Sequence, residues 1–86
     1  MTSKITATDR WHFLAEQDFP EVATISGEPQ YYLVSGVLLL KTSDGEYYVG
    51  RCEIVEHEKV WRFYDRDEHE LRDVVEWAQI LGEEAL

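Results

Sequence analysis

The sequence predicts an α+β fold, in which a short N-terminal helix, an antiparallel meander of three strands and a C-terminal helix follow one another. Three observations lead to this fold class: an Asp-Gly turn between two apolar runs, a second turn that continues the same alternation, and a stripe of apolar residues at helical spacing near the C-terminus. The C-terminal helix is expected to pack on one face of the sheet. The sequence leaves open whether residues 21–26 add a fourth strand.

The length and composition set the class of protein. The chain has 86 residues, so we expect one small domain over residues 1–86, and its 44% hydrophobic content is sufficient for a packed core. Cys52 is the single cysteine, which excludes an internal disulfide and is typical of a reducing compartment. The first residues lack a signal-like apolar segment, and the longest apolar run, VLLL at 37–40, is too short to cross a membrane as a helix. We therefore expect a cytoplasmic protein.

A short helix is predicted close to the N-terminus. Thr8 is a suitable N-cap, and Asp9 would lie in the first turn, where negative charge is favourable. The segment DFPE should end the helix, because Pro20 disfavours helical backbone at the residue before it. Three apolar residues would share one face of this helix: Trp11, Leu14 and Ala15.

The middle of the chain is predicted to be extended. Residues 31–41 have the composition of a long strand with a bulge at Gly36. Asp44-Gly45 is typical of a two-residue type I′ hairpin turn, and a second hairpin is expected around residues 56–59. The two turns predict these opposed pairs: Leu39–Gly50, Val37–Cys52, Cys52–Phe63, Glu53–Arg62 and Ile54–Trp61.

This register sorts side chains between the two faces of the meander. The apolar face would form the core and would carry Val37, Leu39, Tyr48, Cys52, Ile54, Trp61 and Phe63. The opposite face would carry Tyr47, Arg51, Glu53, Arg62 and Tyr64.

Residues 67–81 are predicted to form the C-terminal helix. Asp65 or Asp67 could cap it, and Gly82 is a suitable stop. The residues that form an apolar stripe at helical spacing are Leu71, Val74, Val75, Ala78 and Leu81.

The order of several single residues resembles a family of small domains of unknown function that is common in phage and prophage genomes. The matching features are an early tryptophan, a short acidic turn with Pro-Glu, an apolar strand with an Asp-Gly turn and a later glycine, a mid-chain tryptophan and a closing Val-x-x-Trp. They correspond here to Trp11, DFPE, VLLLKTSDGEYYVG, Trp61 and VVEW. The chain departs from the family in its tail, which reads AQILGEEAL where the family usually has a proline. The resemblance implies a phage or prophage origin and brings no known catalytic residues.

Few residues suggest catalysis or metal binding. His69 and Asp73 would share one side of the predicted helix, but a zinc site needs a third ligand, which His57 or His12 would have to supply through the fold. Cys52 is expected to be a buried, inert thiol on the apolar face. No glycine-rich phosphate loop is present. We therefore expect no enzyme activity, no cofactor and no bound metal, and keep a metal-dependent hydrolase built on His57, His69 and Asp73 as an alternative.

The charge balance favours a basic protein partner. The formal net charge of −10 disfavours direct contact with nucleic acid and attracts basic surfaces. On the predicted helix, carboxylates three or four residues apart could also imitate successive phosphates. Large apolar groups at a polar rim are typical of protein interfaces. The predicted partner-binding residues are Glu70, Asp73, Glu76, Trp77, Ile80, Glu83, Tyr47 and Tyr64.

The sequence thus predicts a small acidic protein that binds a host protein through a basic surface and inhibits or adapts it, in the cytoplasm of the host cell. The partner could be a protein that handles nucleic acid. A homo-oligomer, such as a dimer that buries the exposed apolar groups against a second copy, is a further alternative. No contact with a membrane is expected.

Overall fold

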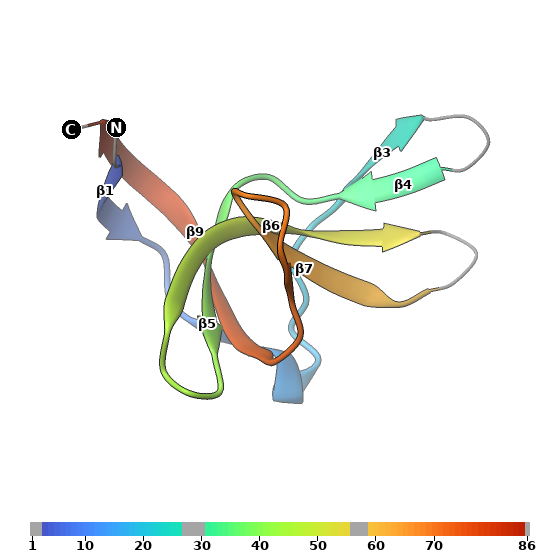
Figure 1. Cartoon of the computed structure of the whole chain (residues 1–86), viewed down its shortest axis with the longest axis horizontal. Helices are drawn as coiled ribbons and strands as arrows, with labels where there is room; N and C mark the ends of the chain where they lie inside the picture. Colours follow the sequence, from blue (N-terminus) through green and yellow to red (C-terminus); the bar gives the residue numbers. More distant parts are fainter. Residues whose placement is uncertain (1–2, 27–30, 56–58, 86) are drawn as a thin grey trace.

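A computed structural model describes residues 3–26, 31–55 and 59–85 of the chain. Within these residues the structure is almost entirely extended, with nine strands and a single 3-10 turn (Figure 1). The elements in order are β1 (Ser3–Thr8), β2 (His12–Phe13), η1 (Leu14–Glu16), β3 (Ala23–Ser26), β4 (Tyr31–Val34), β5 (Leu38–Thr42), β6 (Tyr47–Val55), β7 (Trp61–Asp65), β8 (Glu70–Leu71) and β9 (Val74–Ala85). The predicted α+β class is therefore wrong, and the fold is all-β.

The strands form a continuous antiparallel arrangement. The main path runs β1-β9-β5-β6-β4-β3, while β2 pairs with β9, β7 with β6, and β8 with β7. Figure 1 shows β1 and the end of β9 forming one arm, the β3–β4 hairpin forming another, and the two chain ends lying side by side. Among the described residues, no helix has the length and apolar character needed to cross a lipid bilayer. Residues 23–26 do form the additional strand that the sequence left open.

The predicted N-terminal helix does not form. Within the segment that follows Thr8, His12 and Phe13 pair with β9 as β2, and only η1 has helical character. This turn ends at Gln17, whose φ of 59° is left-handed. Asp9 is hydrogen-bonded to the sheet through Gln79 of β9. Its backbone N–H donates to the carbonyl of Gln79, and its carboxylate accepts the backbone N–H of Gln79. The local cap signals were outweighed by hydrogen bonds to a strand about 70 residues away in sequence.

The predicted helix over residues 67–81 is also wrong. Its second half lies in β9, which pairs with β5 along one edge and with β1 and β2 along the other. Burial follows the strand, since Trp77 is 4% exposed and Leu81, which belonged to the predicted buried stripe, is 65% exposed. An irregularity opposite Lys41 and Thr42 shifts the alternation near the start of β9. Pairing on two edges therefore outweighs the helical propensity of this segment.

The predicted long strand over residues 31–41 is extended as expected, but it is divided into β4 and β5. Both parts lie along β6, and Ser35 bridges the gap between them. Its backbone N–H donates to the carbonyl of Cys52, and its hydroxyl accepts the N–H of Cys52. The sheet therefore stays hydrogen-bonded across the break near Gly36.

The register is correct for one hairpin and wrong by one residue for the other. The pairs Cys52–Phe63, Glu53–Arg62 and Ile54–Trp61 are confirmed. In the β5–β6 hairpin, however, Leu38 and not Leu39 lies opposite Gly50. The loop has three residues instead of two, because Thr42 pairs with Glu46 and Gly45 adopts a left-handed φ of 88°.

This shift of one residue changes which β5 side chains are buried. Leu38 and Leu40 lie in the core, whereas Val37 is 55% exposed and Leu39 is half-buried. The buried cluster consists of Leu38, Leu40, Cys52, Phe63, Val74 and Trp77.

Candidate functional site

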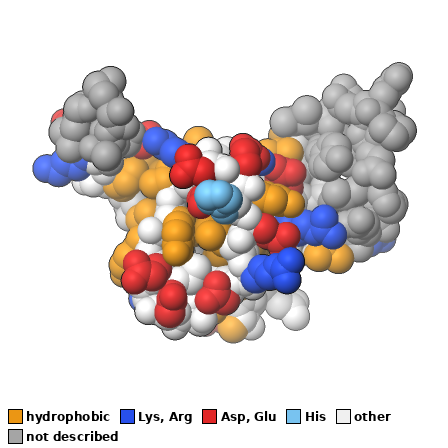
Figure 2. Space-filling model, viewed as in Figure 1, with side chains coloured by type: hydrophobic (Ala, Val, Ile, Leu, Met, Phe, Trp, Pro, Cys, Tyr) orange, Lys and Arg blue, Asp and Glu red, His pale blue; other side chains and the backbone are white. Residues whose placement is uncertain are grey.

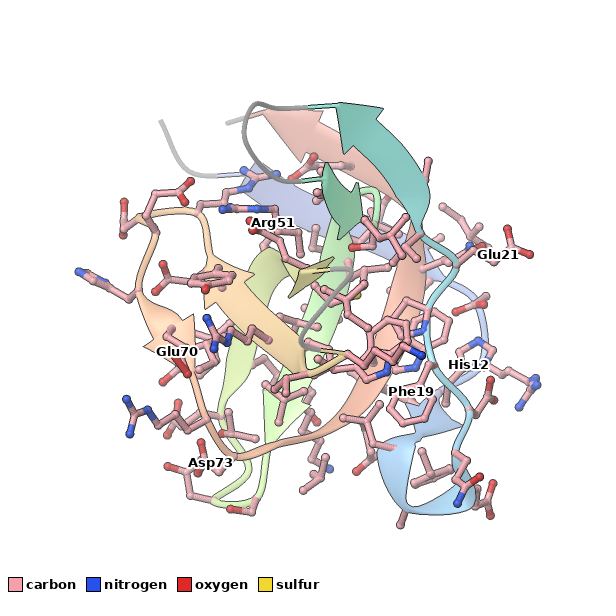
Figure 3. The ribbon with its side chains drawn as sticks, turned by 90° about the vertical axis from the view of Figure 1, so that its right-hand side faces the viewer. His12, Phe19, Glu21, Arg51, Glu70 and Asp73 are labelled. Atoms are coloured by element: carbon pink, nitrogen blue, oxygen red, sulfur yellow. The ribbon has the colours of Figure 1, made fainter. Side chains whose placement is uncertain are left out.

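The predicted partner-binding residues do not share one helix flank, because that helix is absent. Glu70 lies in β8, and Asp73 lies just before β9, where its carboxylate accepts a hydrogen bond from the Ser43 hydroxyl at 3.2 Å. Figure 3 shows Glu70 and Asp73 on the same side of the molecule, away from His12 and Glu21. Whether Glu70 and Asp73 bind a partner stays a prediction.

The remaining predicted residues on β9 differ in their surroundings. Trp77 is a core residue, and Ile80 is half-buried. Glu76 lies 3.5 Å from the ammonium of Lys41, and Glu83 lies 2.7 Å from the guanidinium of Arg66. These carboxylates therefore already have cationic neighbours within the chain.

The two tyrosines lie beside cations. Tyr47 is 56% exposed and packs against Trp11, with ring centroids 5.7 Å apart and Lys41 over its ring. Tyr64 is half-buried under the guanidinium of Arg51, which also binds Glu53 and Glu68. The predicted sheet face is therefore a network of charged groups and aromatic rings.

The predicted metal-binding set is not assembled in the described residues. His57 lies outside them, and His69 contacts Asp65 at 3.4 Å. Asp65, Asp67 and His69 do lie close together in the β7–β8 turn. One oxygen of Asp65 accepts the backbone N–H groups of Asp67 and His69, and these bonds, the one from His69 above all, lower the pKa of Asp65. The cluster is thus accounted for as a turn held by a carboxylate.

Among the described residues, a well-connected group of polar side chains surrounds His12. Pairing of β2 with β9 places His12 opposite Trp77, and the two rings stack with centroids 4.0 Å apart and planes 10° apart. The Trp77 indole N–H donates to the carbonyl of Asp18 at 2.6 Å. This hydrogen bond ties the loop after η1 to β9. The His12 side chain, which is 12% exposed, is therefore held by a strand on one side and a loop on the other.

Both nitrogens of His12 face carboxylates. Nδ1 lies 2.7 Å from Oδ2 of Asp18, and Nε2 lies 2.8 Å from Oδ2 of Asp9. A neutral imidazole has one N–H donor, so only the imidazolium can donate to both oxygens. The contacts, led by the hydrogen bond to Asp9, raise the pKa of His12 although burial opposes this. Burial also acts to raise the pKa of Asp9, but the bonds from His12 and the Gln79 N–H outweigh it and lower that pKa.

An open pocket of about 430 Å3 lies over this cluster. Glu21 contributes a further carboxylate, and the ring of Phe19, which is 38% exposed, forms an apolar wall backed by Trp61 at a centroid distance of 4.7 Å. Figure 3 shows His12, Phe19 and Glu21 on the same side of the molecule. The lining residues are Asp9, His12, Asp18, Phe19, Glu21, Trp77 and Gln79.

The chemistry of this lining suits the binding of a cation. Carboxylates and aromatic faces are the groups that proteins use to hold an ammonium or a guanidinium. Among the described residues that line the pocket, none offers a hydroxyl, a thiol or an amine as a nucleophile. Cys52 is fully buried elsewhere, and burial raises the pKa of its thiol to about 11.

Sequence reasoning did not find this pocket. Asp9 was assigned to a helix, and His12 was considered only as a remote metal ligand. The spacing of Asp9, His12 and Asp18 carries no recognisable motif, because β9 and the turn at Gln17 bring the three together. No pattern in the sequence marks Phe19, which the structure exposes, as part of a site.

Comparison of the chain with protein-family models, with curated protein sequences and with solved structures gives no match.

Proposed function

We propose that this protein is a binding module that recognises a basic surface of another protein, and that the pocket over His12 is the centre of the contact. The observation that carries the proposal is the combination of three carboxylates, Asp9, Asp18 and Glu21, with the exposed ring of Phe19 around one open pocket. Such a site offers both attraction for a cation and apolar contact with its aliphatic stem.

The charge of the whole molecule supports the same proposal. The net charge of −10 draws a basic partner toward the chain and raises the rate of encounter. Figure 2 shows acidic side chains distributed over the face viewed, with hydrophobic groups among them. A field of this kind steers the partner, whereas the pocket supplies the short-range contacts that decide how long it stays.

The resemblance to small phage domains suggests the setting. In a phage-infected cell the partner would be a host protein, and occupation of its basic surface would inhibit it or redirect it. A host protein that handles nucleic acid is a suitable candidate, because such proteins present the basic surfaces that this pocket would recognise.

The proposal is tested by titrating the isotopically labelled protein with a short peptide that contains both lysine and arginine, and by following backbone amide shifts. We expect the largest shifts at Asp9, His12, Asp18 and Glu21. Glu21→Gln should weaken binding several-fold, because it removes one carboxylate from the pocket. Glu70→Gln, on another side of the molecule, is the matched control and should leave the affinity close to that of the wild type. Shifts centred on Glu70 and Asp73 would contradict the proposal.

A further inference from the structure

A cationic side chain of the chain itself lies at the edge of the pocket. Arg10, whose side chain is 73% exposed, places a guanidinium nitrogen 3.5 Å from Oδ2 of Asp18. The same oxygen accepts the Nδ1–H of His12 at 2.7 Å. One carboxylate oxygen at the rim of the pocket is therefore shared by two cationic groups of the chain itself.

Further acceptors at the pocket remain available. Within the described part of the chain, neither Oδ1 of Asp18 nor the carboxylate of Glu21 has a hydrogen-bond or ion-pair partner. The exposed Phe19 ring lies beside them. A guanidinium is planar, stacks on aromatic faces and donates to several oxygens at once, whereas an ammonium is a compact, strongly hydrated charge. The arrangement suits arginine better than lysine.

The positive charge of the His12 imidazolium disfavours the binding of a second cation beside it. It donates Nδ1–H to Asp18 and Nε2–H to Asp9, and the remaining groups that line the pocket from β9 are the neutral Trp77 and Gln79. On the paired strands, Glu76 of β9 forms an ion pair with Lys41 of β5. An arginine that replaces Arg10 at Asp18 reaches Oδ2 as well as the available Oδ1, and so competes with the Nδ1–H of His12 for its acceptor, while the Nε2–H bond to Asp9 is kept.

We infer that the pocket binds the guanidinium of an arginine side chain, which displaces Arg10 from Asp18, and that binding is coupled to release of the Nδ1 proton of His12 to the solvent. The bound arginine stays protonated, the N–H bond of His12 is the only bond that breaks, and a buffer base receives the proton. This inference rests on the proposed function and specifies the ligand and the regulation of its site. Affinity for arginine should therefore rise as pH rises.

The experiment uses three small probes, the N-acetyl amides of arginine, lysine and citrulline, the last of which is the neutral analogue of arginine. Titrations followed by amide and imidazole nuclear magnetic resonance signals give the affinity at pH 5.5 and at pH 8. We expect the arginine probe to bind about tenfold more tightly at pH 8, which corresponds by linkage to a decrease of about one unit in the pKa of His12 on binding. The lysine probe should bind several-fold more weakly, and the citrulline probe should not bind.

Two variants separate the parts of the inference. Arg10→Gln removes the internal competitor at an exposed position and should raise the affinity for the arginine probe several-fold. His12→Gln should abolish the pH dependence between pH 5.5 and 8. Because the second variant could disturb the fold, the unbound and bound pKa of wild-type His12 provide an independent measure of the coupling.

The outcomes distinguish this inference from the proposed function. Equal affinities for the arginine and lysine probes, or an affinity that does not change with pH, would overturn the inference and leave the binding module intact. A mixed lysine and arginine peptide that causes no shifts at the pocket at either pH would overturn the proposed function as well.

Discussion

Gly50 lies where two strands of the sheet approach each other closely. It lies in β6 opposite Asp65 of β7 and is buried. A Cβ added there would overlap the carbonyl oxygen of Tyr64 and lie 2.9 Å from its carbonyl carbon. The absence of a side chain is therefore what permits β7 to pair with β6 at this point.

Gly50→Ala should destabilise the protein by about 1 to 3 kcal/mol, because either strand must move to relieve the overlap. Gly36→Ala is the matched control, since a Cβ at Gly36 meets nothing within 4 Å. Chemical denaturation of both variants measures the difference. Equal free energies of unfolding for the two variants would show that Gly50 does not lie in close contact with the Tyr64 carbonyl.

Cys52 is predicted to be unreactive in the folded protein. Its side chain is fully buried, and burial raises the pKa of the thiol to about 11, so that little thiolate is present at neutral pH. A thiol reagent added at pH 7.5 should modify Cys52 only as fast as the protein unfolds, and at once in denaturant. Rapid labelling of the native protein would contradict this.

At the scale of elements, β9 connects the N-terminal strands to the central sheet. It pairs with β5 on one edge and with β1 and β2 on the other, and it brings Trp77 both to the core and under the ring of His12. A helix in the same segment would remove the hydrogen bonds that β1, β2 and β5 make to β9.

Two variants in β9 distinguish the strand from a helix. Trp77→Ala should cost about 3 to 5 kcal/mol, because it removes a buried aromatic side chain and leaves a cavity. Leu81→Ala should cost less than about 0.5 kcal/mol, because Leu81 is 65% exposed. The predicted helix placed Leu81 in the buried stripe and so implied a large loss of stability for Leu81→Ala. Thermal or chemical unfolding followed by tryptophan fluorescence, and by circular dichroism for Trp77→Ala, gives both values.

The elements that the sequence predicted correctly are those whose partners are near in sequence. The β6–β7 register followed from alternation, because apolar residues such as Cys52 and Phe63 had to meet on one face and the charged pair Glu53 and Arg62 on the other. The β5–β6 register slipped by one residue because Asp44-Gly45 fits both a two-residue and a three-residue loop. In this chain the hydroxyl of Thr42 donates to Asp44, which favours the longer loop.

The strand structure of the two segments predicted as helices, and the position of the pocket, could not be predicted in the same way. The segment of β9 contains residues that fit a helix locally, and its strand structure depends on pairing with remote residues, as between Lys4 and Glu84. The pocket then depends on that pairing, because β9 is what carries Trp77 and Gln79 to His12. Local propensity contains no information about such remote partners.

At the scale of the whole molecule, stability should depend on pH through the cluster at His12. The folded pKa of His12 is raised above its ordinary value of 6.5, so its contribution is complete below pH 6.5 and is lost as pH rises through the folded pKa. The folded pKa of Asp9 is lowered below its ordinary value of 3.8, so its contribution is present above that pH and is lost as pH falls.

The free protein should therefore be most stable between about pH 4 and pH 6.5, and its melting temperature should fall on both sides of that range. The lowered pKa values of Asp44 and Glu68, caused first by the hydrogen bonds from Thr42 and Arg51, act in the same direction on the acid side. Scanning calorimetry from pH 3 to pH 9 measures the profile. In His12→Gln the decline on the alkaline side should be reduced, and an unchanged decline would assign it to another group.

The pairing of β1 with β9 also has a consequence for the synthesis of the protein. Ser3 lies opposite Ala85, and Leu40 in the core lies opposite Trp77. While the chain is growing on a ribosome, β5 and β6 can form their hairpin early, but the strand that must lie between β5 and β1 is still inside the exit tunnel. The completed fold therefore has to wait until β9 has left the tunnel, and contacts between such distant residues predict slow folding for so small a chain. Until then the apolar face of β5 remains open to chaperones.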